Sequence, residues 1–242
     1  MAQRLSKFKK MKLYSFDLYC PPLYIRLEVI HIMVNKYLRN FLHLLVFFFL
    51  LASNANAGNG LLGMDHEIPF DQSGVWARKY QLSLEYGSAL FVVGGALWEG
   101  SDSRLGQTYW KSVDAMLIGD ASATILKDVF RRQRPIDGNN PNAWFQSSGN
   151  ASFPSGEVTH ITSIVTPFIA EYGRDQPLVW LLTLLPMYDG VARMKSQAHW
   201  QSDVLGAAAL GTASGLYANS RDQAWTASVL PGGFTVGYRK VF

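Results

Sequence analysis

Long stretches of helical periodicity dominate this sequence and constrain its fold more than any other feature. Apolar residues recur at the three- and four-residue spacing of an α-helix in residues 77–98, 107–132, 155–172, 177–194 and 199–218. Pro135 ends the second stretch, because a residue before proline avoids helical torsions. Residues 58–76 indicate an irregular arm, and residues 233–242 alternate like a short strand or an extended tail. The sequence therefore predicts a chain built mainly from helices.

The charges are distributed unevenly along the chain. Residues 1–57 hold eight Lys or Arg residues against two acidic ones, whereas residues 58–242 hold 14 against 16. The net charge of +4 therefore comes from the N-terminal segment, and the remainder gives no reason to expect a nucleic-acid partner. The only cysteine is Cys20, so residues 58–242 form neither an internal disulfide nor a thiolate metal site.

The N-terminal segment has the features of a secretory signal. A basic stretch that starts at Met33 precedes the apolar run "FLHLLVFFFLLA", and Ala55 and Ala57 supply the small residues of a cleavage site. We expect translation to start at Met33 and cleavage to follow Ala57, which leaves residues 58–242 as one domain. An uncleaved anchor is the alternative. Either way we expect an exported protein, periplasmic or associated with the cell envelope, with association with the inner membrane left open.

The apolar runs within residues 58–242 are short. "SALFVVGGALW" and "LVWLLTLLPMY" hold 11 residues each, whereas a membrane span needs about 20. These lengths favour buried core helices in a soluble or peripheral domain. The small residues of "GAAALGTASG", residues 206–215, predict close contact between helices.

Lys127 and Arg134 form the first of three groups of residues that indicate chemistry. They are seven residues apart, close to two helical turns, so we expect both cations to project from one helix face. Two convergent cations, one of them a guanidinium fork, suit a phosphoryl group. Because Arg131 and Arg132 lie between them, a solvated basic stretch explains the same pattern.

The second group is "FPSGE", residues 153–157. Pro154, Ser155 and Gly156 precede an apolar run and mark a helix N-terminus, where unpaired N–H groups and the helix dipole attract an anion. Gly156 lets a ligand approach the backbone closely. A plain helix cap formed by Ser155 with Glu157 is the alternative.

The third group is Arg193-x5-His199-x3-Asp203. His199 and Asp203 are four residues apart, so we expect them on one helix face. A carboxylate beside an imidazole fixes its tautomer and leaves the other ring nitrogen free as a nucleophile or base. A structural hydrogen bond between the two side chains is the alternative.

Together the three groups resemble the type 2 phosphatidic acid phosphatase / vanadium haloperoxidase superfamily, whose pattern reads K-x6-R-P, P-S-G-H and S-R-x5-H-x3-D. The resemblance covers residues 127–203 and implies an all-α fold, a compact helical bundle with the site at its core, and no metal or other cofactor. It implies that His199 attacks phosphorus and that Asp203 orients it. The phosphoryl oxygens would be held by Lys127, Arg134, Arg193 and the backbone N–H groups of Ser155 and Gly156.

Two positions depart from that pattern. Ala192 replaces the serine before Arg193, which removes one hydroxyl donor. Glu157 replaces the histidine expected to protonate the leaving group. Three hypotheses follow: Glu157 is itself the general acid, His160 one turn further along the helix replaces it, or the site binds phosphate with little turnover.

The leading functional hypothesis is a phosphatase that hydrolyses a phosphomonoester or pyrophosphate and forms a phosphohistidine, and a lipid-linked substrate is favoured. The expected partner is a phosphorylated small molecule or lipid, and contact with a membrane surface stays open. A catalytically weak or inactive phosphate- or lipid-binding protein is the alternative, because of Glu157. A vanadium haloperoxidase is a further alternative, disfavoured by the short mature chain. Trp144, Phe145 and Phe153 flank the groups in sequence and suggest either an apolar entrance or core packing.

Overall fold

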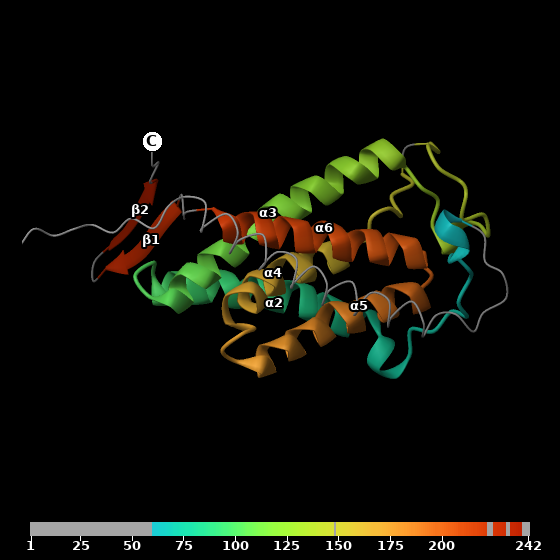
Figure 1. Cartoon of the computed structure of the whole chain (residues 1–242). Helices are drawn as coiled ribbons and strands as arrows, with labels where there is room; N and C mark the ends of the chain where they lie inside the picture. Colours follow the sequence, from blue (N-terminus) through green and yellow to red (C-terminus); the bar gives the residue numbers. More distant parts are fainter. Residues whose placement is uncertain (1–59, 148, 222–224, 231–232, 239–242) are drawn as a thin grey trace, which may run out of the picture. The chain divides into compact units, whose positions relative to one another are not determined.

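The computed structural model describes residues 60–147, 149–221, 225–230 and 233–238, which all lie in one compact unit, Phe47–Phe242. The predicted signal segment, the start at Met33 and the cleavage after Ala57 lie outside the described residues. Figure 1 shows five long α-helices in the described part, followed by two short strands. The helices are α2 (Arg78–Glu99), α3 (Arg104–Phe130), α4 (Gly156–Tyr172), α5 (Leu184–Lys195) and α6 (Gln201–Ser220).

Helix α4 is the centre of the bundle and packs against each of the other four helices (Figure 1). Its residues from Val158 to Phe168 are all buried, so this stretch of the helix has no face open to water. The helical bundle implied by the family resemblance is therefore confirmed in the described residues. Within that part of the chain, no helix combines the length and apolar character needed to cross a bilayer.

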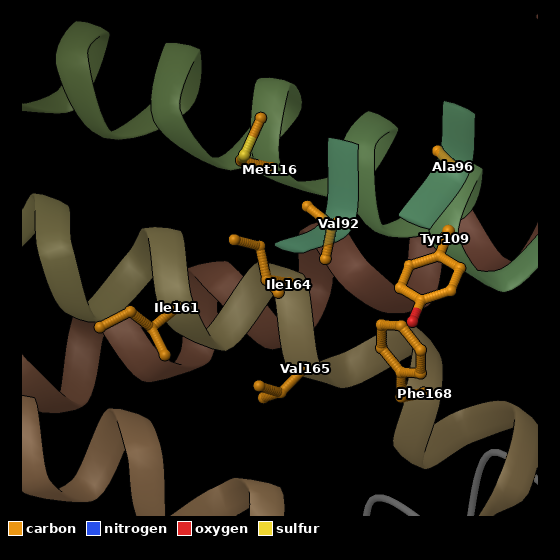
Figure 2. Close-up of a cluster of buried hydrophobic side chains, with 8 residues drawn as sticks. All are labelled: Val92, Ala96, Tyr109, Met116, Ile161, Ile164, Val165 and Phe168. Atoms are coloured by element: carbon orange, nitrogen blue, oxygen red, sulfur yellow. The ribbon is translucent and has the colours of Figure 1, made fainter. Parts of the chain in front are cut away.

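The larger hydrophobic core lies where α2, α3 and α4 meet, and Figure 2 shows its eight buried side chains. The rings of Tyr109 from α3 and Phe168 from α4 meet edge to face, with centroids 5.3 Å apart. A smaller core joins α4, α5 and α6 through Val158, Met194, Val204 and Ala207. The smaller core lies beside the N-terminus of α4 and so anchors the end of the bundle that carries the sequence motifs.

Glycines bring α4 and α6 into close contact. A Cβ atom added at Gly211 would lie 2.6 Å from Thr162 Cβ, and one added at Gly215 would lie 2.4 Å from Thr166 Cβ. Real Cβ atoms do not approach so closely, so only glycine fits at these two positions. The close helix contact predicted from the small residues 206–215 is confirmed.

Several boundaries differ from the sequence predictions. The predicted helix over residues 177–194 divides into the 3-10 helix η4 (Pro177–Thr183) and α5. The alternating C-terminal residues form β2 (Gly233–Tyr238), as expected, but β2 pairs antiparallel with β1 (Trp225–Leu230), a strand that the sequence reading missed. The all-α class therefore describes the bundle and not this hairpin.

The expected irregular arm packs across the turn between α5 and α6. It contains the 3-10 helices η1 (Leu61–Gly63) and η2 (Gly74–Trp76). Asp65 accepts a hydrogen bond from Ser202 N at 2.8 Å, and His66 and Gln201 exchange two hydrogen bonds. These contacts fix the first turn of α6, which carries Asp203.

Candidate active site

His199 lies at the centre of the candidate site and is 4% exposed. Its Nδ1 atom donates to the carbonyl oxygen of Ser152 at 2.6 Å. A carbonyl only accepts, so Nδ1 carries the ring proton and Nε2 keeps its lone pair. Burial, followed by the charges of Arg193, Lys127 and Arg134, holds the pKa of His199 well below its usual value. The imidazole is therefore neutral at pH 7, the form that acts as a nucleophile.

Asp203 contacts His199 less directly than expected. Helix α6 begins at Gln201, so His199 precedes the helix and the prediction that both lie on one helix face is wrong. Asp203 Oδ2 lies 3.9 Å from His199 Nδ1 and accepts instead from the Ser152 hydroxyl at 2.5 Å and from Trp200 N at 2.8 Å. Asp203 is the third residue of α6, and its carboxylate caps the N-terminus of this helix by accepting from Trp200 N. Ser152 connects Asp203 to His199, because its hydroxyl bonds the carboxylate and its carbonyl bonds the imidazole.

A fully buried arginine supports this carboxylate. Arg132 donates to Asp203 Oδ1 at 2.5 Å and to Asp65 Oδ2 at 2.6 Å, and it also donates to the Pro141 carbonyl. All three charged side chains are fully buried, so each depends on the others to offset its loss of hydration. The sequence reading assigned Arg132 to a basic stretch and missed this role, because burial cannot be read from its position.

Lys127 and Arg134 approach the site from different structural elements. Helix α3 ends at Phe130, where Arg131 takes a left-handed conformation (φ 40°), so Arg134 lies beyond the helix, next to the 3-10 helix η3 (Pro135–Asp137). The prediction that they share a helix face is therefore wrong. Both charges nevertheless act on His199, and burial with the charges of Arg134 and Arg193 lowers the pKa of Lys127 to about 8.

The N-terminus of α4 lies beside the Lys127 amine. A Cβ atom added at Gly156 would lie 3.7 Å from Lys127 Nζ, so the amine and the first turn of α4 border the same space. The Ser155 hydroxyl is fully buried, does not cap the helix, and has no hydrogen-bond partner among the described residues. Ser155 N donates to the Asp203 carbonyl at 3.3 Å, so this N–H does not face a ligand as expected. Gly156 keeps an N–H without an intrahelical acceptor.

Glu157 is held between two arginines. Its Oε2 accepts from Arg78 Nη1 at 2.6 Å, and its Oε1 lies 3.4 Å from Arg193 Nη1. Gln81 Oε1 accepts from both guanidinium groups at 3.1 Å each, which ties the three helices α2, α4 and α5 together. Arg193 Nε is buried and has no hydrogen-bond partner in the part of the chain that the structure describes. Arg193 thus keeps one donor for an anion.

His160 faces away from this group, toward α3. Its Nδ1 atom lies 2.9 Å from Asp120 Oδ2, and the Asp120 side chain is 43% exposed. Burial alone would lower the pKa of His160, but the Asp120 contact and the charges of Asp120 and Glu85 outweigh it and raise the pKa. His160 therefore pairs with a carboxylate that is open to solvent.

These residues form a group suited to an anion. His199 offers a neutral ring nitrogen, Lys127, Arg134 and Arg193 supply positive charge, and Ser155 and Gly156 supply donors. Such an arrangement stabilises a phosphoryl group through charge and position. The described residues contain no group of three or more His, Cys, Asp or Glu side chains placed to hold a metal ion.

A protein-family model covers most of the residues that form this group. The model of the PAP2 superfamily matches residues 108–226. Through this region, the chain belongs to the PAP2 superfamily. Among solved structures, that of Aquifex aeolicus LpxE is similar, with 19% identity and a TM-score of 0.41 over 59% of this chain and 85% of that one. A comparison with curated proteins finds no match.

The PAP2 region includes most of the site but not all of it. Asp65 and Arg78 precede residue 108, and they bind the buried arginine and Glu157 respectively. No motif identified either residue, because each acts through a contact more than 60 residues away in sequence. Ala192, the other departure from the superfamily pattern, is fully buried.

A further acidic residue of the PAP2 region escaped the sequence reading. Asp189 is fully buried on α5, one turn before Arg193, and neither of its carboxyl oxygens has a hydrogen-bond partner among the described residues. Burial and then the charge of Glu157 raise the pKa of Asp189 to about 7. The only sequence signal for Asp189 was that an acidic residue lies within an apolar helix pattern.

Proposed function

We propose that this protein is a phosphatase that hydrolyses a phosphomonoester or pyrophosphate through a phosphohistidine. The observation that carries the proposal is the state of His199: its Nδ1 is bonded to the Ser152 carbonyl, its Nε2 is free to attack, and three cations act on it. Membership of the PAP2 superfamily supports the same reaction class.

In the proposed mechanism, His199 Nε2 attacks phosphorus while Lys127, Arg134 and Arg193 balance the charge of the phosphoryl oxygens. The ester P–O bond breaks as the N–P bond forms, and the leaving oxygen takes up a proton. Water then attacks phosphorus, the N–P bond breaks, and its electron pair returns to Nε2. Asp203 and Ser152 hold the ring throughout, since the Ser152 hydroxyl is bonded to Asp203.

An apolar pocket at the start of α2 supports a lipid-linked substrate. A pocket of about 370 Å³ is lined only by Val75, Tyr80, Leu84, Leu185 and Tyr188. Arg78, which bonds Glu157, lies between two of these residues in sequence, and Tyr188 precedes Asp189. Two of the lining side chains are open to solvent, since Val75 is 62% exposed and Tyr80 is 48% exposed. A hydrocarbon chain would find contact area there while its phosphate lies at His199.

We further propose that the protein works outside the cytoplasm, in the periplasm or at the cell envelope. The signal-like segment that ends at Ala57 supports this location. Secretion of a fusion that carries residues 33–57, compared with the same fusion without them, tests this proposal. Equal retention of both fusions in the cytoplasm would contradict it.

The experiment that tests the reaction is phosphate release from phosphatidate, a prenyl pyrophosphate and an aryl phosphate ester. We expect release from at least one of them by the wild type. His199→Ala should reduce it by at least about 10³-fold, because the covalent step is lost. Full activity in His199→Ala would contradict the mechanism. His66→Ala is the matched control, since His66 belongs to the arm and its ring forms a hydrogen bond with the Met64 carbonyl.

A phosphate-binding protein without turnover is the second candidate. The contacts of Glu157 favour it, because its two carboxyl oxygens lie against Arg78 and Arg193. Calorimetric binding of phosphate or vanadate, with no phosphate released from any of the three substrates, would establish this alternative.

A further inference from the structure

Arg78 of α2 reaches the N-terminus of α4 and pairs there with Glu157. Its Nη1 atom donates to Glu157 Oε2 at 2.6 Å, and the two side chains are 37% and 11% exposed. Arg78 precedes the part of the chain that the PAP2 model matches, and the proposed mechanism does not use it. Because Glu157 directly follows Gly156, this ion pair borders the N-terminus of α4, where the phosphoryl group is proposed to bind.

The other carboxyl oxygen of Glu157 lies near Arg193, one of the three cations proposed to hold the phosphoryl oxygens. Glu157 Oε1 is 3.4 Å from Arg193 Nη1, against 2.6 Å for the contact between Oε2 and Arg78. The carboxylate is therefore shared unequally, and Arg78 holds it more closely. Arg193 Nε is buried and has no hydrogen-bond partner among the described residues, so the contacts of Arg193 leave this donor unused.

Gln81 fixes both guanidinium groups in this arrangement. Its side chain is fully buried, and its amide nitrogen donates to the Trp76 carbonyl at 2.8 Å. Its amide oxygen accepts from Arg78 Nη1 and from Arg193 Nη1 at 3.1 Å each. The two guanidinium groups thus share one amide oxygen and one carboxylate, so the loss of one of them changes the contacts that are left to the other.

A carboxylate beside Arg193 competes with a phosphoryl group for the same positive charge. Both are anions that a guanidinium binds through charged hydrogen bonds, and two like charges at one site repel each other. If Arg78 is removed, the nearest cation left to Glu157 in the described part of the chain is Arg193. The carboxylate would then move onto Arg193 and take up donors that a phosphoryl oxygen needs.

We propose that Arg78 is a positioning residue, which holds the Glu157 carboxylate off Arg193 and so keeps Arg193 available to a phosphoryl group. This inference rests on the proposed function, because that function places an anion at Arg193. It follows that Glu157 weakens the binding of phosphate and that Arg78 reduces this effect. If Arg78 instead attracted phosphate through its own charge, its effect would not depend on Glu157.

A double-mutant cycle on the binding of inorganic phosphate tests the proposal. Calorimetry at pH 7 gives the Kd of the wild type, Arg78→Gln, Glu157→Gln and the variant with both changes. We expect about tenfold weaker binding in Arg78→Gln and about tenfold tighter binding in Glu157→Gln. In the Glu157→Gln background, Arg78→Gln should change the Kd by less than about threefold, because no carboxylate is left to hold.

Two further measurements separate positioning from a purely structural role. Arg78→Lys keeps a cation opposite Glu157 and should restore the Kd of the wild type to within about threefold. An aryl phosphate with an electron-withdrawing ring leaves without an acid, so kcat/KM for this ester should follow the same order as the affinity for phosphate. A structural role for Arg78 predicts neither tighter binding in Glu157→Gln nor rescue by that second change.

Arg104 and Glu171 provide a matched control on the same helix. Arg104 Nε donates to Glu171 Oε1 at 2.6 Å, so this pair also joins an arginine to a glutamate of α4. Glu171 lies near the other end of α4, roughly four helical turns after Glu157. Arg104→Gln and Glu171→Gln should therefore leave the Kd for phosphate unchanged.

Two results would overturn the proposal. Equal weakening by Arg78→Gln with and without Glu157 would mean that Arg78 acts through its own charge. Unchanged or weaker binding in Glu157→Gln would mean that the carboxylate does not compete with phosphate. Circular dichroism establishes folding, and Glu157→His and Arg78→Met replace the glutamine variants where these do not fold.

The cycle also separates this proposal from the phosphatase function. If the wild type binds phosphate but releases none from any ester, the phosphatase function fails, and the four Kd values still decide the role of Arg78. A wild type that binds no phosphate would overturn both, because no anion would then lie at Arg193.

Discussion

The Ser152 hydroxyl donates to Asp203 at 2.5 Å, while the Ser152 carbonyl accepts from His199 at 2.6 Å. Asp203 itself lies 3.9 Å from the imidazole nitrogen. One loop residue therefore carries the connection between the acidic residue and the histidine. The orientation of His199 therefore depends on Asp203 through Ser152. Asp203 also pairs with the buried Arg132, so it should affect both activity and stability.

We expect Asp203→Asn to lower both activity and stability, and Asp65→Asn to lower mainly stability. Each substitution removes one of the two carboxylates that pair with the buried Arg132, so each should lower the free energy of unfolding by about 3 kcal/mol. Only Asp203 is bonded to Ser152, so only Asp203→Asn should also reduce kcat by about 10²-fold. Urea unfolding and phosphate release measure the two effects.

One result for these two variants would contradict this prediction. If Asp65→Asn reduced kcat as strongly as Asp203→Asn at a temperature where both are folded, the loss would reflect the buried charge network as a whole. The Ser152 connection would then have no separate role in orienting the ring.

The sequence predicted the helices well because their signal is local. All five helical stretches correspond to described helices, with ends that differ by one to three residues in most cases, since periodicity and proline positions act over a few residues. The division of residues 177–194 into η4 and α5 was missed, because a 3-10 helix keeps a similar apolar spacing. The sequence did not predict strand β1, because this segment becomes a strand mainly through its pairing with β2.

The motif residues of the site were also predicted, but several of their relationships were not. Spacing alone placed His199 on a helix, yet Asp203 bonds Trp200 N and starts α6 after the histidine. Arg132 looked like its neighbour Arg131, although one is fully buried and the other is exposed. Asp189 carries no motif at all. Each of these facts depends on which distant segments pack together, which short-range patterns do not contain.

The low pKa of Lys127 predicts how anion binding changes with pH. Lys127 is charged below about pH 8 and loses its charge as the pH rises, so affinity for vanadate should decline between about pH 7.5 and 9.5. Lys127→Arg should keep its affinity over this range, because an arginine stays charged. Calorimetric titration at several pH values checks this. An equal decline in both proteins would assign the change to another group.

The lowered pKa of Lys127 also predicts that this residue destabilises the folded protein. Its folded pKa of about 8 lies below the usual value of 10.5, so the folded state disfavours the charged form, and this cost is fully present below about pH 8. Stability should rise between about pH 8 and 10.5, where the unfolded chain binds more protons. Lys127→Met should therefore raise the free energy of unfolding at pH 7 by about 1 kcal/mol or more, with less gain at pH 10. Urea unfolding of both proteins at the two pH values gives the comparison.

Glu157 should raise the pH at which Asp189 loses its proton. Its charge raises the pKa of Asp189, so Glu157→Gln should lower that pKa and make Asp189 lose its proton at a lower pH. The C=O band of a protonated carboxylic acid in difference infrared spectra follows this titration directly and does not require activity. Glu67→Gln is a suitable control, because Glu67 lies in the arm and its side chain bonds Gln197. A titration unchanged by Glu157→Gln would show that the two carboxyl groups do not interact.

The two kinds of helix glycine should respond in opposite directions to alanine. At Gly215 the new methyl group would lie 2.4 Å from Thr166 Cβ, so α6 would have to move away from α4, and we expect the free energy of unfolding to fall by about 2 kcal/mol. At Gly94, within α2, the described structure has nothing within 4 Å of the added atom, so Gly94→Ala should raise it by about 0.5–1 kcal/mol through helix propensity. Urea unfolding at constant m-value measures both.

Because α4 carries Gly156 and Glu157, Gly215→Ala should also reduce kcat, whereas Gly94→Ala should leave it unchanged. Equal stability in the two variants would mean that α4 and α6 do not pack as closely as their glycines indicate.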